Sequence, residues 1–300
     1  MFEGAIVIAV SSARCRLFFD GREADCVVPS EIARRQRSAL AVGDRVVAEP
    51  VEGNLWRLVS ILPRRTVLSR PDPFNPRVER LIAANIDIAV NVVSIKAPPL
   101  RPRLIDRFLI AIERGGARPA ICVNKIDLAR DREAALQPLR VYEELAVPVV
   151  VCSTRSGEGI DALRALIEGK ICAFVGHSGV GKSSILNALD ARLQLATADV
   201  QKKRGTGRHT TTASTLFDLG AETYLNDTPG IREFGLWDIT PESLREAFPE
   251  FQEVAERCRF NDCSHIHEPD CEVKKRVERG EISPARYETY VRISEDLGRK

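Results

Sequence analysis

The sequence predicts a multidomain protein, with a small N-terminal β-barrel, a central α/β domain containing a phosphate-binding loop, and a mostly helical C-terminal domain. Three observations predict this division. Short β-branched segments with turn signals run to about residue 62, long apolar strands alternate with helical periodicity from about 80 to 240, and helical patterns opening with Thr240-Pro241 and Ser283-Pro284 follow. We therefore expect domains at residues 1–70, 71–239 and 240–300.

The barrel is predicted from five short segments, AIVIAV, RCRLFF, DCVVP, DRVVAEP and NLWRLVSIL, separated by the turn pairs Asp20-Gly21, Gly43-Asp44 and Gly53-Asn54. Five such strands suit either an oligonucleotide-binding (OB) barrel or an SH3-like barrel, and the number of strands does not decide between them. We take the OB-fold as the expected architecture. The proline-rich stretch PDPFNP at 71–76 indicates a linker to the central domain.

In the central domain, IDIAVNVVS (86–94) and RPAICVNK (118–125) are predicted to be buried strands of a parallel sheet. The helix between them has an apolar face, and Gly115-Gly116 can terminate it; that face consists of Leu104, Ile105, Phe108, Leu109 and Ile112.

The composition limits the possible classes of protein but does not indicate a function. With 44% apolar residues the chain can build ordinary cores, and a net charge of +2 provides no global field for nucleic acid. There is no apolar run long enough to span a bilayer, and an acid stands near the N-terminus where a signal peptide carries basic residues. We expect a cytoplasmic monomer without a membrane partner.

A phosphate-binding loop follows the apolar strand KICAFV and opens the helical segment SSILNALD, which is the context that the motif requires. Backbone N–H groups and the helix N-terminus would converge there on phosphate oxygens. Lys182 would reach the β- and γ-phosphates as a catalytic group, and Ser183 would bind Mg²⁺. The alternative is a chance glycine-rich turn. The expected nucleotide-binding residues of this loop are Gly176, His177, Ser178, Gly179, Val180, Gly181, Lys182, Ser183 and Ser184.

A second phosphate-side motif, Asp227-Thr228-Pro229-Gly230, follows the strand-like segment TYLN. Asp227 could hold Mg²⁺ through water, and the Gly230 N–H could meet the γ-phosphate. Taken alone, such a segment is more often only a turn.

Base recognition is predicted from Asn124-Lys125-Ile126-Asp127, which follows the strand AICV. The Asp127 carboxylate can accept hydrogen bonds from both N1–H and N2–H₂ of guanine, and adenine offers no matching pair of donors. The alternative is a helix-capping surface turn. Ser153, after the strand VPVVVC, begins a loop that could close over the base.

The motifs therefore occur in an unusual order, with the base motif and base loop before the phosphate loop. A parallel sheet tolerates this order because its site is assembled from loops at one edge. We expect the segments around Asp127 and Lys182 to enclose one GTP or GDP molecule together with Mg²⁺.

The eight cysteines divide into two groups. Five are scattered through apolar segments and are expected to be buried reduced thiols: Cys15, Cys26, Cys122, Cys152 and Cys172. The other three, with one histidine, form a soft tetrahedral set suited to one structural Zn²⁺: Cys258, Cys263, His265 and Cys271. His267 is a rival fourth ligand, and three unrelated buried cysteines are the alternative.

On these motifs the chain resembles the ribosome small subunit-dependent GTPase A family of circularly permuted GTPases. The likeness covers nearly the whole chain: the N-terminal barrel, NKID, GHSGVGKSS, RGTGRHTTT, DTPG and the cysteine-histidine cluster. The resemblance implies GTP hydrolysis stimulated by the small (30S) ribosomal subunit, a role in late maturation of that subunit, and contact with its rRNA.

The resemblance also implies roles for residues of the segment 204–212, which looks like switch I. Thr211 is the expected Mg²⁺ and γ-phosphate sensor, with Thr210 and Thr212 as alternatives. Ile231 follows DTPG, near where many GTPases carry a water-orienting glutamine, so His209 is the candidate for positioning the water. The alternative interpretation is that His209 is a surface histidine in a basic loop.

Two hypotheses concern the partner and the mechanism. The expected rRNA contact is a basic surface made of Lys202, Lys203, Arg204 and Arg208 with Arg64, Arg65 and Arg70. The alternative is that these charged runs are only solvated, which is the usual case. GTP would fix the barrel and the zinc domain in an arrangement that grips the ribosome, and hydrolysis would release it. The competing functions are a P-loop kinase acting on a small acceptor and a non-catalytic assembly scaffold with bound GTP.

Overall fold

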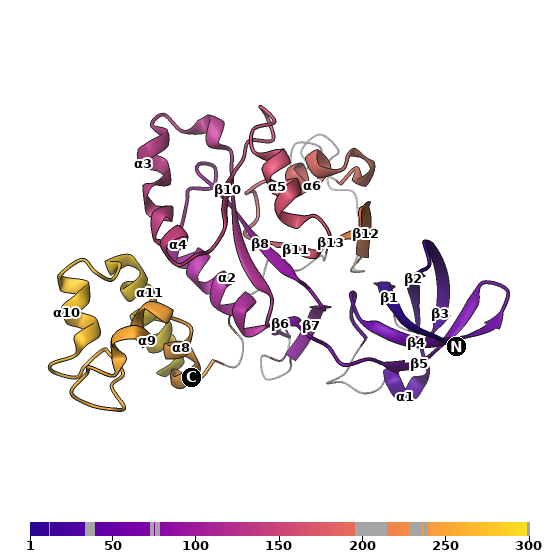
Figure 1. The fold of residues 1–300 in the computed structure, drawn as a ribbon, viewed down its shortest axis with the longest axis horizontal. Helices are drawn as coiled ribbons and strands as arrows, with labels where there is room; N and C mark the ends of the chain where they lie inside the picture. The colour runs from indigo at the N-terminus through magenta and orange to yellow at the C-terminus, as the bar shows by residue number, and fades with distance from the viewer. Residues whose placement is uncertain are drawn as a thin grey trace.

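The structure, a computed structural model, describes residues 1–11, 13–33, 40–72, 75, 79–195, 215–227, 236 and 239–298. The N-terminal barrel and the C-terminal helices lie at opposite ends of the molecule, with the α/β domain between them (Figure 1). The predicted architecture of barrel, α/β domain and helical domain is thereby confirmed.

The N-terminal barrel consists of β1 (Phe2–Val10), β2 (Arg14–Phe19), β3 (Arg22–Val27), β4 (Arg45–Glu52) and β5 (Leu55–Ile61). The strands are hydrogen-bonded in the order β1-β2-β3-β5-β4, and β4 pairs with β1 to close the barrel. The β3–β5 pair is parallel, and the short helix α1 (Ser30–Ala33) lies between β3 and β4 in the chain. This closed order is that of an OB barrel, which decides between the two predicted architectures.

The central sheet has five parallel strands in the order β10-β9-β8-β11-β13, and the antiparallel β12 at its edge. Their bounds are β8 Ile88–Ser94, β9 Arg118–Asn124, β10 Val149–Val151, β11 Ile171–Val175, β12 Thr215–Gly220 and β13 Thr223–Asp227. Because the parallel strands share one direction, the loops after β8, β9, β10, β11 and β13 all leave from one edge of the sheet.

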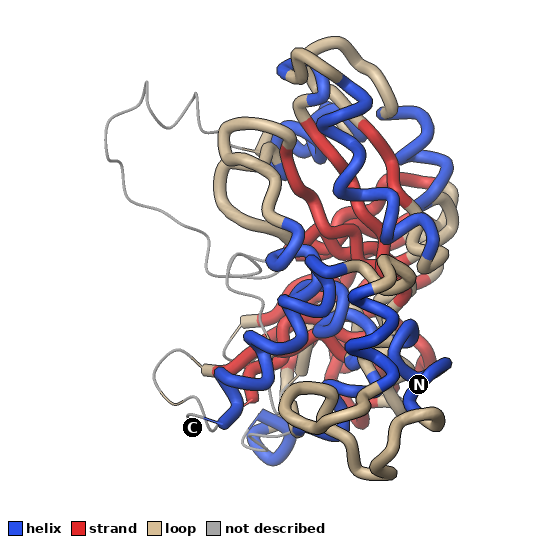
Figure 2. The backbone as a smooth tube through the Cα atoms, turned by 90° about the vertical axis from the view of Figure 1, so that its left-hand side faces the viewer, coloured by secondary structure: helices blue, strands red, loops and turns tan. Residues whose placement is uncertain are grey.

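Helices cover both faces of this sheet (Figures 1 and 2). The apolar side chains of α5 (Ile160–Ile167) and α6 (Lys182–Leu189) pack on one face. Those of α2 (Pro102–Arg114) and α4 (Arg140–Glu144) pack on the other, and the short α3 (Arg132–Leu136) precedes α4. The apolar face predicted for the first helix matches α2, which ends just before Gly115 as expected.

The barrel is joined to the central sheet in two ways. Ala9 of β1 pairs with Thr215 of β12, so the barrel and the sheet form one continuous set of strands. A hairpin of β6 (Val67–Pro71) and β7 (Glu79–Ala84) contributes to an apolar cluster that also contains Ile6 of the barrel and Phe108 of α2. The proposed domain boundary at 70/71 therefore falls inside β6.

The C-terminal domain is helical, as predicted, with α8 (Pro241–Glu246), α9 (Pro249–Ala255), α10 (Glu272–Glu278) and α11 (Pro284–Gly298). Thr240 caps α8: its hydroxyl accepts a hydrogen bond from the Ser243 amide, and the Thr240 backbone N–H donates one to the Ser243 hydroxyl. In the described part of the chain, no helix combines the length and apolar character needed to cross a membrane.

One expectation about the basic surface needs correction. Arg64 donates two hydrogen bonds, of 2.7 and 2.8 Å, to the carboxylate of Asp44, which is 0% exposed. Arg64 is thus held in an ion pair just after the last strand of the barrel, and its side chain is not available to RNA. Arg65 is more exposed and lies 3.1 Å from Asp87. The prediction for the five scattered cysteines is confirmed, since all of them are buried free thiols.

We predict that Arg64→Ala lowers the free energy of unfolding by about 3 kcal/mol, because it leaves the buried Asp44 carboxylate without its cation. Urea unfolding followed by tryptophan fluorescence measures this. Arg16→Ala is the control, since its pair with Glu23 is about half exposed on both sides and should cost less than about 1 kcal/mol. Equal effects of the two substitutions would contradict the structural role of Arg64.

Candidate nucleotide site and metal centre

The phosphate loop connects β11 to α6, as the sequence predicts, and its glycines are required by the backbone. Gly176, Gly179 and Gly181 have φ angles of +139°, +83° and +99°, a region that favours glycine. A Cβ on Gly176 would also collide with the carbonyl oxygen of Val92 on the neighbouring strand β8. The Lys182 Nζ donates hydrogen bonds to the Gly176 and His177 carbonyl oxygens, so its ammonium group lies over the loop.

The base motif lies directly against this loop. Asn124, 1% exposed at the end of β9, donates from Nδ2 to the Val180 carbonyl oxygen at 3.0 Å. The Lys125 Nζ donates to the Gly179 carbonyl oxygen at 2.7 Å. Two successive residues of the base motif therefore hold two successive residues of the phosphate loop, although more than fifty positions separate them in sequence.

The base loop is attached to the same cluster. The Ser153 hydroxyl, fully buried, donates to Asp127 Oδ1 at 2.6 Å and accepts from the amides of Arg155 and Ser156. The Thr154 amide is 3.4 Å from Asn124 Oδ1. Ser153 thus orients the Asp127 carboxylate, while the Asp127 side chain itself remains exposed at the edge of the sheet.

The segments around Asp127, Ser153 and Lys182 therefore form one cluster at the carboxyl edge of the sheet, as the single-site hypothesis requires. Thr154 is a contact that the sequence motifs did not predict, because its contribution is a backbone amide. A carboxylate beside a phosphate loop provides what a guanine nucleotide needs: an acceptor for the base and N–H donors for phosphates.

The predicted magnesium and switch residues are only partly described. Ser183 lies in the first turn of α6, half-buried, beside Lys182. Asp227 is the last residue of β13, which pairs in parallel with β11, so its backbone reaches the same edge as the phosphate loop. The remaining predicted residues lie outside the described ranges: Lys202, Lys203, Arg204, Arg208, His209, Thr210, Thr211, Thr212, Gly230 and Ile231.

The four predicted zinc ligands converge in the C-terminal domain. Their ligand atoms all lie within 4.8 Å of one another, and all four residues, Cys258, Cys263, His265 and Cys271, are buried. The Cys258 and Cys271 sulfurs are 3.9 Å apart, and they lie 3.6 and 3.4 Å from His265 Nδ1. The edges of a tetrahedron around Zn²⁺ are about 3.6 to 3.8 Å, so the cluster fits this ion. The rival ligand His267 is exposed and outside the cluster.

The electrostatics of the cluster also fit a cation. Burial, together with the neighbouring thiols, raises the pKa of Cys263 to about 12 and raises that of Cys271, so these thiols would not ionise readily without a metal. Burial lowers the pKa of His265, which favours the neutral, metal-binding imidazole. Four protein ligands leave no open coordination position, which is typical of a structural site.

Glu268, which the sequence motifs did not identify, organises the ligand loop. Its carboxylate accepts hydrogen bonds from the Ser264 amide, the Ser264 hydroxyl and the Ile266 amide, which flank His265. Burial alone would raise the Glu268 pKa, but these hydrogen bonds lower it to about 2. The carboxylate therefore stabilises the loop above its ordinary pKa, and this stabilisation is lost as the pH falls toward 2.

Comparison with known proteins agrees with this geometry. The sequence model of the RsgA GTPase family matches residues 61–237. A relative from Haemophilus influenzae named small ribosomal subunit biogenesis GTPase RsgA is 40% identical over 270 residues, covering 88% of this chain and 77% of the relative. A relative of the same name from Chlorobaculum parvum is 42% identical over 291 residues, covering 93% and 92%.

Two solved structures have the same fold over essentially the whole chain. The crystal structure of YjeQ from Thermotoga maritima aligns with a TM-score of 0.78 and 33% identity, covering all of both chains. The structure of YloQ, described as a circularly permuted GTPase, aligns with a TM-score of 0.74 and 30% identity, covering 99% of this chain and 96% of the other.

We predict that Gly181→Ala weakens binding of a fluorescent guanine nucleotide by about tenfold or more, because the new Cβ collides with Asn124 Nδ2 and displaces its bond to Val180. Gly169→Ala is the matched control. Gly169 also has a positive φ, +68°, but a Cβ there meets nothing within 4 Å. If both variants bound nucleotide equally weakly, backbone strain rather than the Asn124 contact would be responsible.

We also predict that Glu268→Gln lowers zinc affinity by roughly 10- to 100-fold, because it weakens the hydrogen bonds that shape the ligand loop. Competition with a chromogenic chelator measures this affinity. Asp270→Asn is the control, since Asp270 lies in the same loop but pairs only with surface cations among the described residues. An unchanged affinity in Glu268→Gln would remove the proposed role of Glu268.

Proposed function

The chain belongs to the RsgA GTPase family, and from this premise we propose that it hydrolyses GTP to GDP and phosphate during biogenesis of the small ribosomal subunit. The observation that carries the nucleotide assignment is the hydrogen bond from Asn124 to the Val180 carbonyl oxygen, which joins the base motif to the phosphate loop. A site built in this way would bind one nucleotide from both ends.

The base end would select guanine. Asp127 would accept from N1–H and N2–H₂, and its orientation by the Ser153 hydroxyl supports this role. An adenine base would leave this carboxylate unmatched, which discriminates strongly. The loop residues from Gly176 to Ser184 would hold the phosphates with backbone N–H groups, as the positive φ angles of three of its glycines allow.

The phosphate end would perform hydrolysis by positioning and charge. Lys182 would neutralise the β- and γ-phosphates, and Ser183, Asp227 and Thr211 would hold Mg²⁺, which supplies further positive charge when bound. The Gly230 N–H would contact the γ-phosphate. His209 would position the attacking water, because Ile231 stands near where a glutamine would otherwise do so.

Zn²⁺ would be structural. Bound by Cys258, Cys263, His265 and Cys271, it would contribute folding free energy to the C-terminal domain and no chemistry to hydrolysis. We further propose a monomer that acts in the cytoplasm, that contacts small-subunit rRNA through exposed basic residues other than Arg64, and that is stimulated by the subunit late in its maturation. The proposed domains are residues 1–70, 71–239 and 240–300, of which the first boundary falls inside β6.

We predict that Asp127→Asn reduces GTP affinity by about 100-fold or more, since an amide NH₂ then faces the guanine donors. The same variant should gain affinity for xanthosine nucleotides, whose 2-oxo group accepts from that amide. Competition titrations with GTP, xanthosine triphosphate and ATP against the wild type measure this. Tight ATP binding by the wild type would instead support the kinase alternative.

We predict that His209→Ala abolishes turnover stimulated by the small subunit while leaving GTP affinity within about twofold, because His209 would act on the water rather than on the nucleotide. Phosphate release is measured with and without purified small subunits. Unchanged stimulation would remove His209 from the mechanism, and absence of any turnover by the wild type would favour the scaffold alternative.

A further inference from the structure

A buried cluster of charged side chains joins the central domain to the C-terminal domain, and nucleotide or zinc binding does not account for it. Asp106 of α2 is 1% exposed and accepts hydrogen bonds from the Tyr142 hydroxyl at 2.8 Å and from Arg286 of α11 at 2.9 Å. Arg286 also makes two hydrogen bonds, of 2.7 and 3.0 Å, to the carboxylate of Glu250 in α9. We call Asp106, Arg286 and Glu250 the interdomain ion-pair cluster.

This cluster is anchored on the C-terminal side by aromatic packing. The Arg286 guanidinium lies over the Phe248 ring, 4.6 Å from its centroid, and Phe248 stacks on Phe251. Phe251 belongs to the same apolar cluster as the zinc ligands Cys258, Cys263 and Cys271. Arg286 is therefore held by the core that surrounds the zinc site.

Helix α2 belongs to the cores of both domains. Its Ile110 lies in the apolar cluster of the C-terminal domain, while its Ile105 and Leu109 pack with β8, β9 and α4 in the central domain. With Asp106 and Ile110 both engaged by the C-terminal domain, α2 and that domain must move together or separate at considerable cost.

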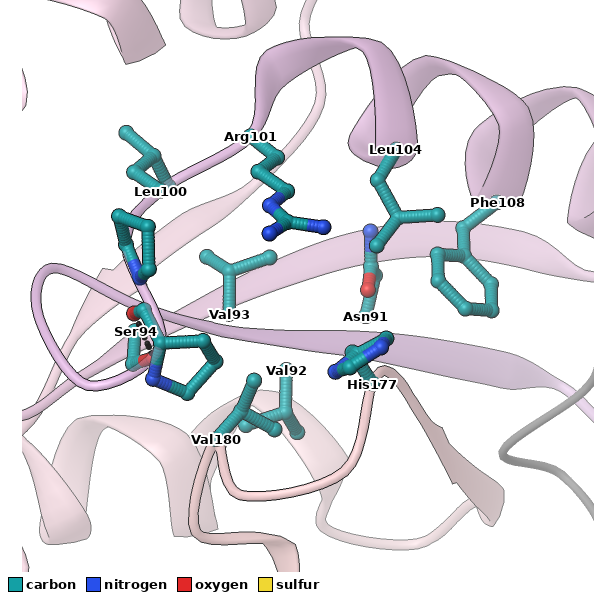
Figure 3. A pocket seen from close by; sticks show the side chains of 12 residues that line it. Asn91, Val92, Val93, Ser94, Leu100, Arg101, Leu104, Phe108, His177 and Val180 are labelled. Atoms are coloured by element: carbon teal, nitrogen blue, oxygen red, sulfur yellow. Dashed lines mark hydrogen bonds between the residues drawn. The ribbon is translucent and has the colours of Figure 1, made fainter.

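The start of α2 borders a narrow cavity behind the phosphate loop (Figure 3). Arg101, Leu104 and Phe108 line one side of this cavity, and His177 and Val180 of the phosphate loop line the other. The space open to the centre of a water molecule is only about 20 Å³, which suits one or two waters rather than a larger ligand.

The floor of the cavity is Asn91 of β8, which is 0% exposed, and neither its Oδ1 nor its Nδ2 has a hydrogen-bond partner in the described structure. The cavity beside this amide means that α2 is not fully packed against the phosphate loop. Helix α2 is thus closely packed against the C-terminal domain and incompletely packed against the phosphate loop.

From this contrast we propose that Asp106 is a positioning residue, which, through Arg286 and α2, couples the C-terminal domain to the phosphate loop. A small subunit bound to the C-terminal domain shifts α2 across the cavity, and the shift changes the setting of His177 and Val180 and hence of the loop. By linkage, removing zinc from the C-terminal domain changes nucleotide affinity through the same helix. The first consequence rests on the proposed function, while the second needs only the two sites.

The test compares the wild type with Asp106→Asn, which keeps the size of the side chain but removes its charge, and with Arg286→Lys, which keeps the charge but loses the paired bonds to Glu250. Arg103→Gln is the control, because Arg103 pairs with Glu288 between the same two helices at an exposed position. We measure zinc content, fluorescent GDP affinity with and without chelation of zinc, and phosphate release with and without small subunits.

We expect the wild type and Arg103→Gln to lose GDP affinity on chelation and to be stimulated by subunits. In Asp106→Asn and Arg286→Lys, zinc content and unstimulated turnover stay within about twofold, whereas both responses are largely lost: a change in GDP affinity of roughly 5- to 150-fold, the usual range of coupling between sites, falls to about twofold or less. Full responses in both variants overturn the proposal, and so does loss of zinc or of the folded state, which indicates a purely structural role.

The two readouts separate this proposal from the proposed function. If subunits do not stimulate the wild type, the proposed function fails, and the chelation experiment still decides the coupling. If chelation leaves the GDP affinity of the wild type unchanged, the coupling is refuted whatever the subunits do.

Discussion

The nucleotide site depends on one short-range constraint, the attachment of the base motif to the phosphate loop through Asn124. Its side chain is buried, it donates to the Val180 carbonyl oxygen, and it requires a glycine at position 181 because a Cβ there would collide with it. These contacts are between loops at the edge of the sheet, so they do not depend on the order in which the strands are connected. The circular permutation is compatible with GTP binding for this reason.

Because of the permutation, the chain leads from the last strand of the central sheet to the C-terminal domain. β13 ends at Asp227, and the C-terminal domain begins at Thr240 with its capped helix α8. The barrel is attached on the other side, where β1 pairs with β12 and the apolar cluster around Ile6 and Phe108 spans both domains. The central domain therefore lies between two accessory domains, which contact it through different elements.

The sequence predicted what local patterns determine. The five barrel strands, the phosphate loop, the capped helix at Thr240 and the four clustered zinc-ligand candidates all have signatures within a few residues, and the structure has these features. It could not decide between barrel types, because that depends on the parallel pairing of β3 with β5 across a long connection. The burial of Arg64 against Asp44 was missed for a similar reason: a basic residue next to other basic residues gives no sign of a partner twenty positions away.

For Asp106, the local sequence pattern contains part of the information but not the identity of the partner. Ile110 outside the predicted apolar stripe is a signal of a second packed face, and Asp106, four residues earlier on the same side of the helix, is a signal of a polar partner there. Neither signal names the partner, since Arg286 is 180 positions further along the chain.

The energetics of this partnership suit an interface that keeps one docked position. Burying Asp106 and Arg286 requires removing both charges from water, and their mutual attraction roughly offsets that cost, so a buried ion pair adds little net stability. The geometric demands of the pair remain strict, because Arg286 must reach Asp106 and Glu250 at the same time. The ion pairs therefore specify one docked position, and Ile110 supplies the apolar contact that favours docking, so that α2 follows the C-terminal domain.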